Sequence, residues 1–262
     1  MEKMTDMVRE YITTVLDKGI RLDGRKLDEF RNIEVEYGIS AKSAEGSARV
    51  KIGRTEVVAG VKLEVGEPYA DNPDEGTIVV NAELLPLSSR DFESGPPSID
   101  SIELSRVIDR AIREGKGVNF KKLCIKKEEA MWMVMIDIYS INDDGNLFDA
   151  AGLVALAALK DAKFPKLTKD NKVDYGTKTT KNLPLEKLPI SITVIKVGNH
   201  YLVDPSSEEE KILDARLTIG VLEDGTPCSM QKGGDNPLSL DEIDNMVELA
   251  VKKSKELRKV LK

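Results

Sequence analysis

The sequence predicts an α+β fold of two related halves packed together, each with a β-sheet covered by helices. Between Ser47 and Val65, two β-rich runs meet at Gly53-Arg54 in the pattern of a β-hairpin. The same arrangement recurs from Ile190 to Pro205, with Gly198-Asn199 at its turn. A longer stretch that contains a helix follows each hairpin, which favours a duplicated architecture although few residues are identical between the halves.

The length, charge and cysteine content of the chain limit the kinds of protein that it can be. With 262 residues, 40% of them hydrophobic, the chain is long enough for one large domain or two packed halves. Its net charge of −7 argues against non-specific coating of nucleic acid, so contacts with a polyanion must be local. Cys124 and Cys228 lie too far apart to indicate a disulfide framework. Because neither a secretory leader nor a membrane-spanning run is evident, we predict a cytoplasmic protein without membrane contact.

The first elements follow from local patterns. Apolar residues at helical spacing from Met4 to Leu16 predict a helix, which Gly19 can terminate. Residues 33–37 alternate between apolar side chains and glutamate, as in a half-buried strand. Between these elements lies a charged cluster from Arg21 to Glu29 with a turn at Asp23-Gly24, and its charge pattern favours a salt-bridged surface over a binding site.

A strand from Thr77 to Leu84 and a helix from about Ser98 to Glu114 follow, the helix with a clear apolar stripe. Its polar side carries Arg106, Arg110 and Arg113, whose spacings of four and three place them on one face. Such a face can pair with phosphates, or it can be a solvated surface paired with acidic neighbours. From the residues alone we favour the solvated surface.

A buried strand from Met131 to Tyr139 leads through an acidic turn into a helix rich in alanine and leucine. A strand-to-helix loop is a natural anion site because backbone N–H groups and the helix N-terminus point into it. Here Asp143, Asp144 and Asp149 surround Gly145, and they would repel an anion. We therefore expect these aspartates to cap the helix.

The second half begins after a polar, lysine-rich stretch from Lys163 to Leu188, which we interpret as a long connection. His200 follows the hairpin turn, which favours a structural role over acid–base catalysis. The acidic residues 208–214 can hold a divalent ion, but acidic loops are usually just solvated, and we predict no metal and no cofactor. The last helix starts with a capping box formed by Ser239 and Glu242.

Several motifs together resemble the RNase PH family over nearly the whole chain: RLDGR at Arg21–Arg25, SIELSRVIDRAIR, the strand–DDG–helix unit and LVDPSSEEE. The resemblance is closest to the non-catalytic ring subunits of archaeal exosomes. It implies a duplicated β-α fold of the ribosomal protein S5 domain 2 type, and 3′-to-5′ phosphorolysis of RNA by the assembled ring. We divide the chain accordingly into an N-terminal helix (1–20), a first half (21–165), a connecting segment (166–189) and a second half (190–262).

Two departures from the family indicate that this chain is not itself an enzyme. Active members carry a Gly-Ser-Arg type phosphate loop where this sequence has Gly145-Asn146-Leu147. They also carry an essential aspartate at the position that Arg216 occupies here. Phosphorolysis needs a bound phosphate and a carboxylate at the scissile bond, so both changes remove chemistry that the reaction requires. We predict no catalytic residue.

The resemblance also changes the interpretation of the arginine face. Arg106 and Arg110 match positions from which the non-catalytic subunit is expected to hold the RNA 3′ end by its phosphates, and Arg90 is a weaker candidate. The implied partners are RNA, a catalytic sister subunit in a hexameric ring (a trimer of heterodimers), and cap subunits that bind RNA. One alternative is a self-sufficient phosphorolytic exoribonuclease. A small-molecule kinase of related fold is disfavoured, because Gly233-Gly234 is the only adjacent glycine pair.

Overall fold

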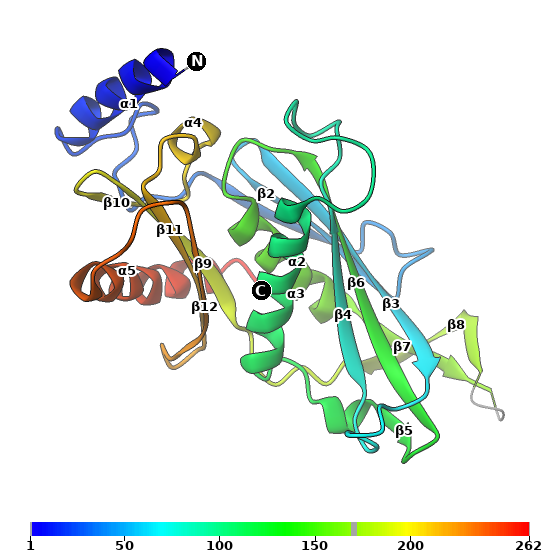
Figure 1. Ribbon diagram of the computed structural model, residues 1–262. Helices are drawn as coiled ribbons and strands as arrows, with labels where there is room; N and C mark the ends of the chain where they lie inside the picture. The colour runs from blue at the N-terminus through cyan, green and yellow to red at the C-terminus, as the bar shows by residue number, and fades with distance from the viewer. Residues whose placement is uncertain (1, 169–171, 262) are drawn as a thin grey trace.

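The computed structural model describes residues 2–168 and 172–261. Its main elements form four layers: a large sheet, the helices α2 (Ile99–Glu114) and α3 (Leu147–Asp161), a smaller sheet, and α5 (Leu240–Arg258) (Figure 1). The predicted α+β class is confirmed. Because α2 and α3 contact both sheets, they join the two halves of the molecule.

The large sheet has the strand order β1-β2-β3-β6-β4, and β5 pairs with β6 at one end. Only β4 runs parallel to its neighbour β6 in this sheet, and the other pairs are antiparallel. Its strands are β1 (Ile33–Tyr37), β2 (Gly46–Ile52), β3 (Thr55–Gly66), β4 (Thr77–Glu83), β5 (Cys124–Lys126) and β6 (Ala130–Asn142). The short helix η1 (Phe120–Leu123) precedes β5.

The smaller sheet is antiparallel, with the order β10-β9-β11-β12. Its strands are β9 (Ile190–Val197), β10 (His200–Val203), β11 (Ala215–Val221) and β12 (Pro227–Gly233). The helix α4 (Ser207–Glu210) lies between β10 and β11 in the chain, and α5 packs on β9 and β11. The N-terminal helix α1 (Glu2–Leu16) contributes Ile12 and Leu16 to a cluster with residues of this second half.

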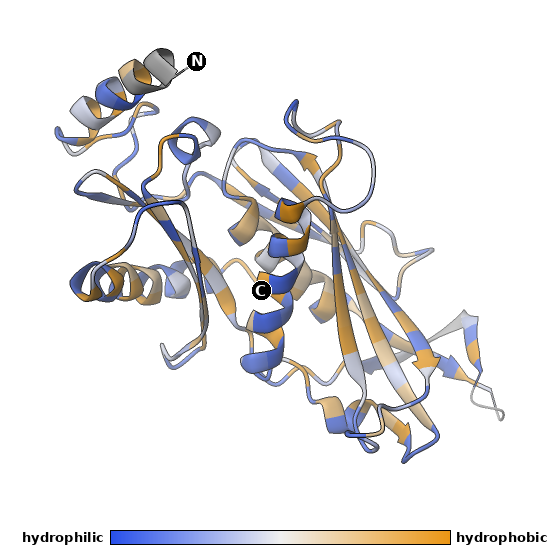
Figure 2. Ribbon diagram, in the orientation of Figure 1, coloured by the Kyte–Doolittle hydropathy of each residue, from blue (hydrophilic) through white to orange (hydrophobic). Residues whose placement is uncertain are grey.

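Helix α3 lies at the centre of the hydrophobic core, and Figure 2 shows it largely orange. Every residue from Asp149 to Leu159 is buried, because the helix has a sheet on either side. Gly46 permits this packing: a Cβ there would lie 2.4 Å from the carbonyl oxygen of Ala158. Small side chains on α3 and a glycine on β2 thus bring the helix close to the large sheet.

The segment interpreted as a long connection between the halves contains strands that the sequence did not indicate. The stretch from Lys163 to Leu188 contains β7 (Lys163–Leu167) and β8 (Val173–Asn182), which pair as an antiparallel ribbon. Its lysines and threonines leave no hydrophobic alternation, so the pattern did not indicate strands.

The predicted hairpin at Gly198-Asn199 and the capping box at Ser239 are confirmed. Among the described helices, none combines the length and apolar character needed to cross a bilayer.

Candidate functional site

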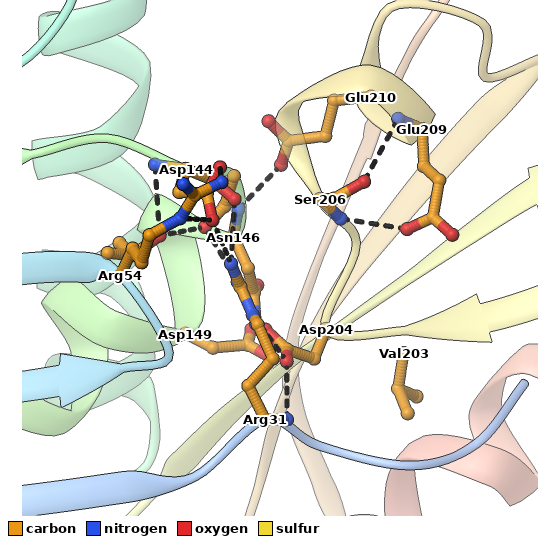
Figure 3. A network of polar contacts seen from close by, with 12 residues as sticks. Arg31, Arg54, Asp144, Asn146, Asp149, Val203, Asp204, Ser206, Glu209 and Glu210 are labelled. Atoms are coloured by element: carbon orange, nitrogen blue, oxygen red, sulfur yellow. Dashed lines mark hydrogen bonds and ion pairs between the residues drawn. The ribbon is translucent and has the colours of Figure 1, made fainter. Parts of the chain in front are cut away.

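Two loops, one from each half, meet at the site that the sequence analysis singled out (Figure 3). The first joins β6 to α3 through Gly145, and the second joins β10 to α4 through Pro205. Gly145 has a φ of 86°, and a Cβ on it would lie 2.5 Å from the carbonyl oxygen of Pro205. Only glycine fits here, since it tolerates both the left-handed backbone and the close approach.

Arg31 links these loops through Asp204 (Figure 3). Its Nη2 donates to Asp204 Oδ1 at 2.7 Å, and its Nε donates to Oδ2 at 2.9 Å. Arg31 Nη1 also donates to the carbonyl oxygen of Asp144 at 2.7 Å. Burial alone would raise the pKa of Asp204, but the hydrogen bonds and charge of Arg31 outweigh burial and lower it. The Asp204 carboxylate therefore stays charged as the centre of a buried network.

The RLDGR motif holds the second loop in place through Arg21 and Arg25. Arg21 is 2% exposed and forms a buried ion pair with Glu209, its Nε lying 2.8 Å from Oε1. It also donates to the carbonyl oxygens of Val203 at 2.8 Å and Asp204 at 2.7 Å. Arg25 Nη1 donates to Asp204 Oδ2 at 2.8 Å. The prediction of a salt-bridged surface is thus wrong for Arg21, because its side chain is buried and holds the second loop in place.

The N-terminus of α3 is occupied by a carboxylate from the other half. The backbone N–H of Asn146, the N-cap residue, donates to Glu210 Oε1 at 2.9 Å (Figure 3). Asn146 has a φ of 63°, and in the described part of the chain its side chain makes no capping hydrogen bond. Instead, its Nδ2 donates to Asp149 Oδ2 at 3.1 Å and to Asp204 Oδ1 at 2.9 Å. The position where this loop would hold an anion is therefore already filled by a carboxyl group of the chain itself.

The predicted capping role of the three aspartates is wrong. Asp143 accepts from the N–H of Gly145, within the loop, at 3.0 Å. Asp144 lies beside Arg54, at 3.2 Å from its Nε. Asp149 is fully buried and accepts from the side chain of Asn146, as described above. Local sequence could not reveal this arrangement, because Glu210 lies 64 residues from the amide that it accepts from.

Two of these carboxyls titrate near neutral pH. Burial raises the pKa of Glu210 from 4.5 to about 7, against the opposing effect of the Asn146 N–H. Burial also raises the pKa of Asp149 from 3.8 to about 8. Both groups bind a proton more tightly in the folded protein than in the unfolded chain. Their contribution to stability is therefore greatest at low pH, and it is lost as the pH rises through these two folded-state values.

The substitution Glu210→Gln tests whether this carboxyl makes the stability of the protein fall with rising pH. We expect the free energy of unfolding of the unmodified protein to fall as the pH rises from about 5 to about 8. In the Glu210→Gln variant, the free energy of unfolding should fall less over this pH range, because one of the two titrations is absent. The difference should be on the order of 2 kcal/mol. Urea unfolding across this pH range measures both slopes. Glu208→Gln is the matched control, since that carboxylate is exposed on the same helix. Equal slopes in all three proteins would contradict the assignment.

Arg216, which stands where active relatives of the family are expected to have aspartate, is part of a structural network. It donates to Glu103 Oε1 at 2.6 Å, and its guanidinium lies 4.0 Å from the ring centroid of Phe148. The side chain lies across Gly233, where a Cβ would come within 2.5 Å of its Nη2. Arg216 thereby connects β11 to α2 and α3, and it places a paired cation at this position.

The predicted arginine face of α2 is only partly present. Arg106 and Arg110 are exposed, and Arg110 Nη2 donates to Gln231 Oε1 on β12 at 2.6 Å. Arg113 is directed elsewhere, because it donates to Asp109 at 2.9 Å and to the carbonyl oxygen of Ile78 at 3.0 Å. The exposed patch therefore consists of Arg106 and Arg110, hereafter the α2 patch.

A pocket of about 540 Å³ lies beside the two loops, lined by Arg90, Asp143, Ser207, Glu210 and Lys211, among others. Both signs of charge line it, so it has no uniform preference for an anion. The carboxylates considered as metal ligands are not brought together: Glu209 pairs with Arg21, and Asp214 lies 2.5 Å from Arg9. Across residues 2–168 and 172–261, no acidic, histidine or cysteine side chains cluster in a metal-binding arrangement.

Comparison with known proteins gives consistent matches over both halves. The model of the 3′ exoribonuclease family, domain 1, matches residues 29–165, and that of domain 2 matches residues 187–253. The exosome complex component Rrp42 of Methanothermobacter thermautotrophicus is 45% identical over 258 residues, covering 98% of this chain and 95% of that protein.

Two solved structures contain similar chains. One is the Archaeoglobus fulgidus exosome with RNA bound to the active site, where the matched chain is 45% identical with a TM-score of 0.90 and the match covers 99% of each chain. The other is an archaeal exosome core, with 42% identity, a TM-score of 0.86, and coverage of 100% of this chain and 99% of that one.

Proposed function

Because this chain belongs to the RNase PH family of 3′ exoribonucleases, we propose that it is a non-catalytic ring subunit of an archaeal exosome. In this role it pairs with a catalytic sister subunit, structures that subunit's active site and helps to bind RNA for 3′-to-5′ phosphorolysis. The hexameric ring would be a trimer of heterodimers with RNA-binding cap subunits, and it would work in the cytoplasm. The full-length similarity to Rrp42 components supports the assembly.

The observation that carries the non-catalytic assignment is the bond between Glu210 and the Asn146 amide. A phosphorolytic site must bind inorganic phosphate as the nucleophile, and backbone N–H groups at a helix N-terminus are its natural donors. Here a carboxylate of the chain itself accepts from that amide, so phosphate would have to displace it. Moreover, the neighbouring loop residues Asp143 and Asp144 are acidic, and they would repel phosphate at this place.

Arg216 supports the same assignment. In its ion pair with Glu103 it presents a positive charge where the active members of the family are expected to present a carboxylate. An arginine cannot accept a proton or ligate a cation at the scissile phosphodiester, because it has no acceptor atom and stays charged. The chain therefore offers neither the nucleophile site nor the carboxylate.

We expect this chain to contribute to RNA binding through the α2 patch. Arg106 and Arg110 are exposed on one face of α2, and guanidinium groups bind phosphate oxygens in a bidentate manner. Gln231 orients Arg110, and its Nε2 also donates to Glu103 Oε1 at 3.4 Å. Arg110 is thus connected to the network that holds Arg216. Contacts with phosphates carry no sequence information, which suits an enzyme that degrades RNA of any sequence.

The test is RNA decay in the presence of inorganic phosphate, with the release of nucleoside diphosphate as the readout. The purified chain is assayed alone and after mixing with its catalytic sister. We expect no release by the chain alone and release by the mixture. Diphosphate release by the chain alone would overturn the proposal in favour of a self-sufficient phosphorolytic exoribonuclease. A sister that is equally active without this chain would show that its contribution is not needed.

A further inference from the structure

The ribbon of β7 and β8 is a basic segment of an acidic chain. Residues 163–182 contain six lysines and two aspartates, a net charge of +4, whereas the whole chain has a net charge of −7. Figure 1 shows the ribbon reaching beyond the large sheet, on the side away from the smaller sheet and α1. It is therefore separate from the α2 patch, and the proposed function gives it no role.

Four lysines of this ribbon whose side chains the structure describes are exposed and lack acidic partners there. Lys163, Lys166, Lys172 and Lys181 are all exposed, and no carboxylate in the described part of the chain lies within ion-pair distance of any of them. Lys181 lies over the ring of Phe164, with its Nζ 5.1 Å from the centroid. These charges are thus available to an external anion.

A second lysine-rich segment provides a contrast. Lys122, Lys126 and Lys127, around β5, are also exposed, but each has an acidic neighbour. Lys122 lies 3.5 Å from Glu186, Lys126 lies 2.6 Å from Glu129, and Lys127 lies 4.0 Å from Glu128. Their charges are locally compensated, whereas those of the ribbon are not. The difference distinguishes a solvated basic surface from one arranged for a polyanion.

The other exposed residues of the ribbon indicate the kind of partner. Its aliphatic side chains Leu167 and Val173 pack against the hydrophobic core, so they cannot form the apolar centre that a protein interface needs. Among the ribbon side chains that the structure describes, the one large exposed hydrophobic residue is Tyr175, which is 52% exposed, and Lys62 Nζ lies 4.5 Å from the centroid of its ring. Lysines spread along a strand pair with an accessible aromatic ring are typical of surfaces that bind single-stranded nucleic acid.

We propose that the β7–β8 ribbon is a second RNA-binding surface, on which Lys163, Lys166 and Lys172 contact backbone phosphates and Tyr175 offers a ring to a base. The proposal rests on the proposed function in that RNA is the substrate of the complex. It does not depend on the catalytic state of this chain. The phosphates of single-stranded RNA are regularly spaced, so they can contact lysines that are distributed over the ribbon. An acidic protein with clustered charges would fit this distribution less well.

The test compares two triple variants of the full-length chain in binding to a labelled single-stranded oligoadenylate. The first is K163Q/K166Q/K172Q, and the matched control is K122Q/K126Q/K127Q, which removes the same number of charges from the compensated segment. All six side chains are exposed, so both variants should melt as the unmodified protein does. Anisotropy measurements at several salt concentrations give the affinity and its salt dependence.

We expect the ribbon variant to bind at least about tenfold more weakly in low salt, with a slope of log affinity against log salt that is shallower by about 2, because each lost phosphate contact contributes about 0.7. The control should change far less. Equal losses in both variants, no loss in the ribbon variant, or no RNA binding by the unmodified chain would each overturn the proposal. Diphosphate release by the chain alone would overturn the proposed function but leave this result unaffected.

Discussion

Replacing Arg106 and Arg110 together with glutamate is expected to slow RNA degradation by the assembled complex by at least roughly 100-fold, because each charge-assisted bond to phosphate contributes about 1.5–3 kcal/mol. The two side chains are exposed on α2, so their replacement removes no core packing. Charge reversal also adds repulsion of the phosphates. We therefore expect the loss to appear in RNA affinity, with the ring still assembled.

The measurement is the rate of diphosphate release by the complex over a range of RNA concentrations, with assembly checked by size-exclusion chromatography. K18E/K42E is the matched control, because it reverses two exposed charges outside α2 and outside the two loops of the site. An unchanged rate in an intact complex would remove the α2 patch from the mechanism. A variant that fails to assemble would instead assign these arginines to the subunit interface, and it would contradict the proposed role as well.

Arg21→Ala is expected to lower the free energy of unfolding by about 3–5 kcal/mol, the usual cost of removing one partner from a buried ion pair. The change leaves the Glu209 carboxylate, which is 2% exposed, without its cation. It also deprives the carbonyl oxygens of Val203 and Asp204 of their donor. Since these groups belong to the second loop of the site, we expect that loop to lose its position before the rest of the protein unfolds.

Urea unfolding and hydrogen exchange measure this effect. Arg54→Ala is the control: its side chain is 84% exposed and pairs with Asp144, so we expect a change within about 0.5 kcal/mol. Arg21→Lys separates charge from geometry, because lysine cannot serve both oxygens of Glu209 and two carbonyls at once. A loss below about 1 kcal/mol for Arg21→Ala would mean that the motif does not hold the loop, contrary to the structure.

Local patterns predicted the elements well wherever one face of a segment is buried. The helical spacing from Ser98 to Glu114 and the capping box at Ser239 correspond to α2 and α5. The β7–β8 ribbon was missed for the opposite reason. Lysines and threonines occupy much of it, so hydrophobic alternation did not reveal strands that are held by backbone pairing.

The candidate site was predictable only in part. Helical spacing and the family resemblance together singled out Arg106 and Arg110, and the resemblance alone identified Asn146 and Arg216 as departures from active members. The sequence did not indicate which side chains surround these two positions. Glu210 belonged to an acidic run that any solvated loop could contain, and nothing local distinguished Arg21 as buried from Arg25 beside it.

By itself, therefore, the sequence determined the α+β class, the positions of most elements and the family resemblance, from which we infer the residues that depart from active members. The tertiary structure alone decided which distant residues pair around the site: Glu210 accepts from the Asn146 amide, Arg21 pairs with Glu209, and Arg216 pairs with Glu103. The physical reason is sequence distance. These partners lie 64, 188 and 113 residues apart, so no periodicity or cap can encode them, and burial brings them together only when both halves have folded.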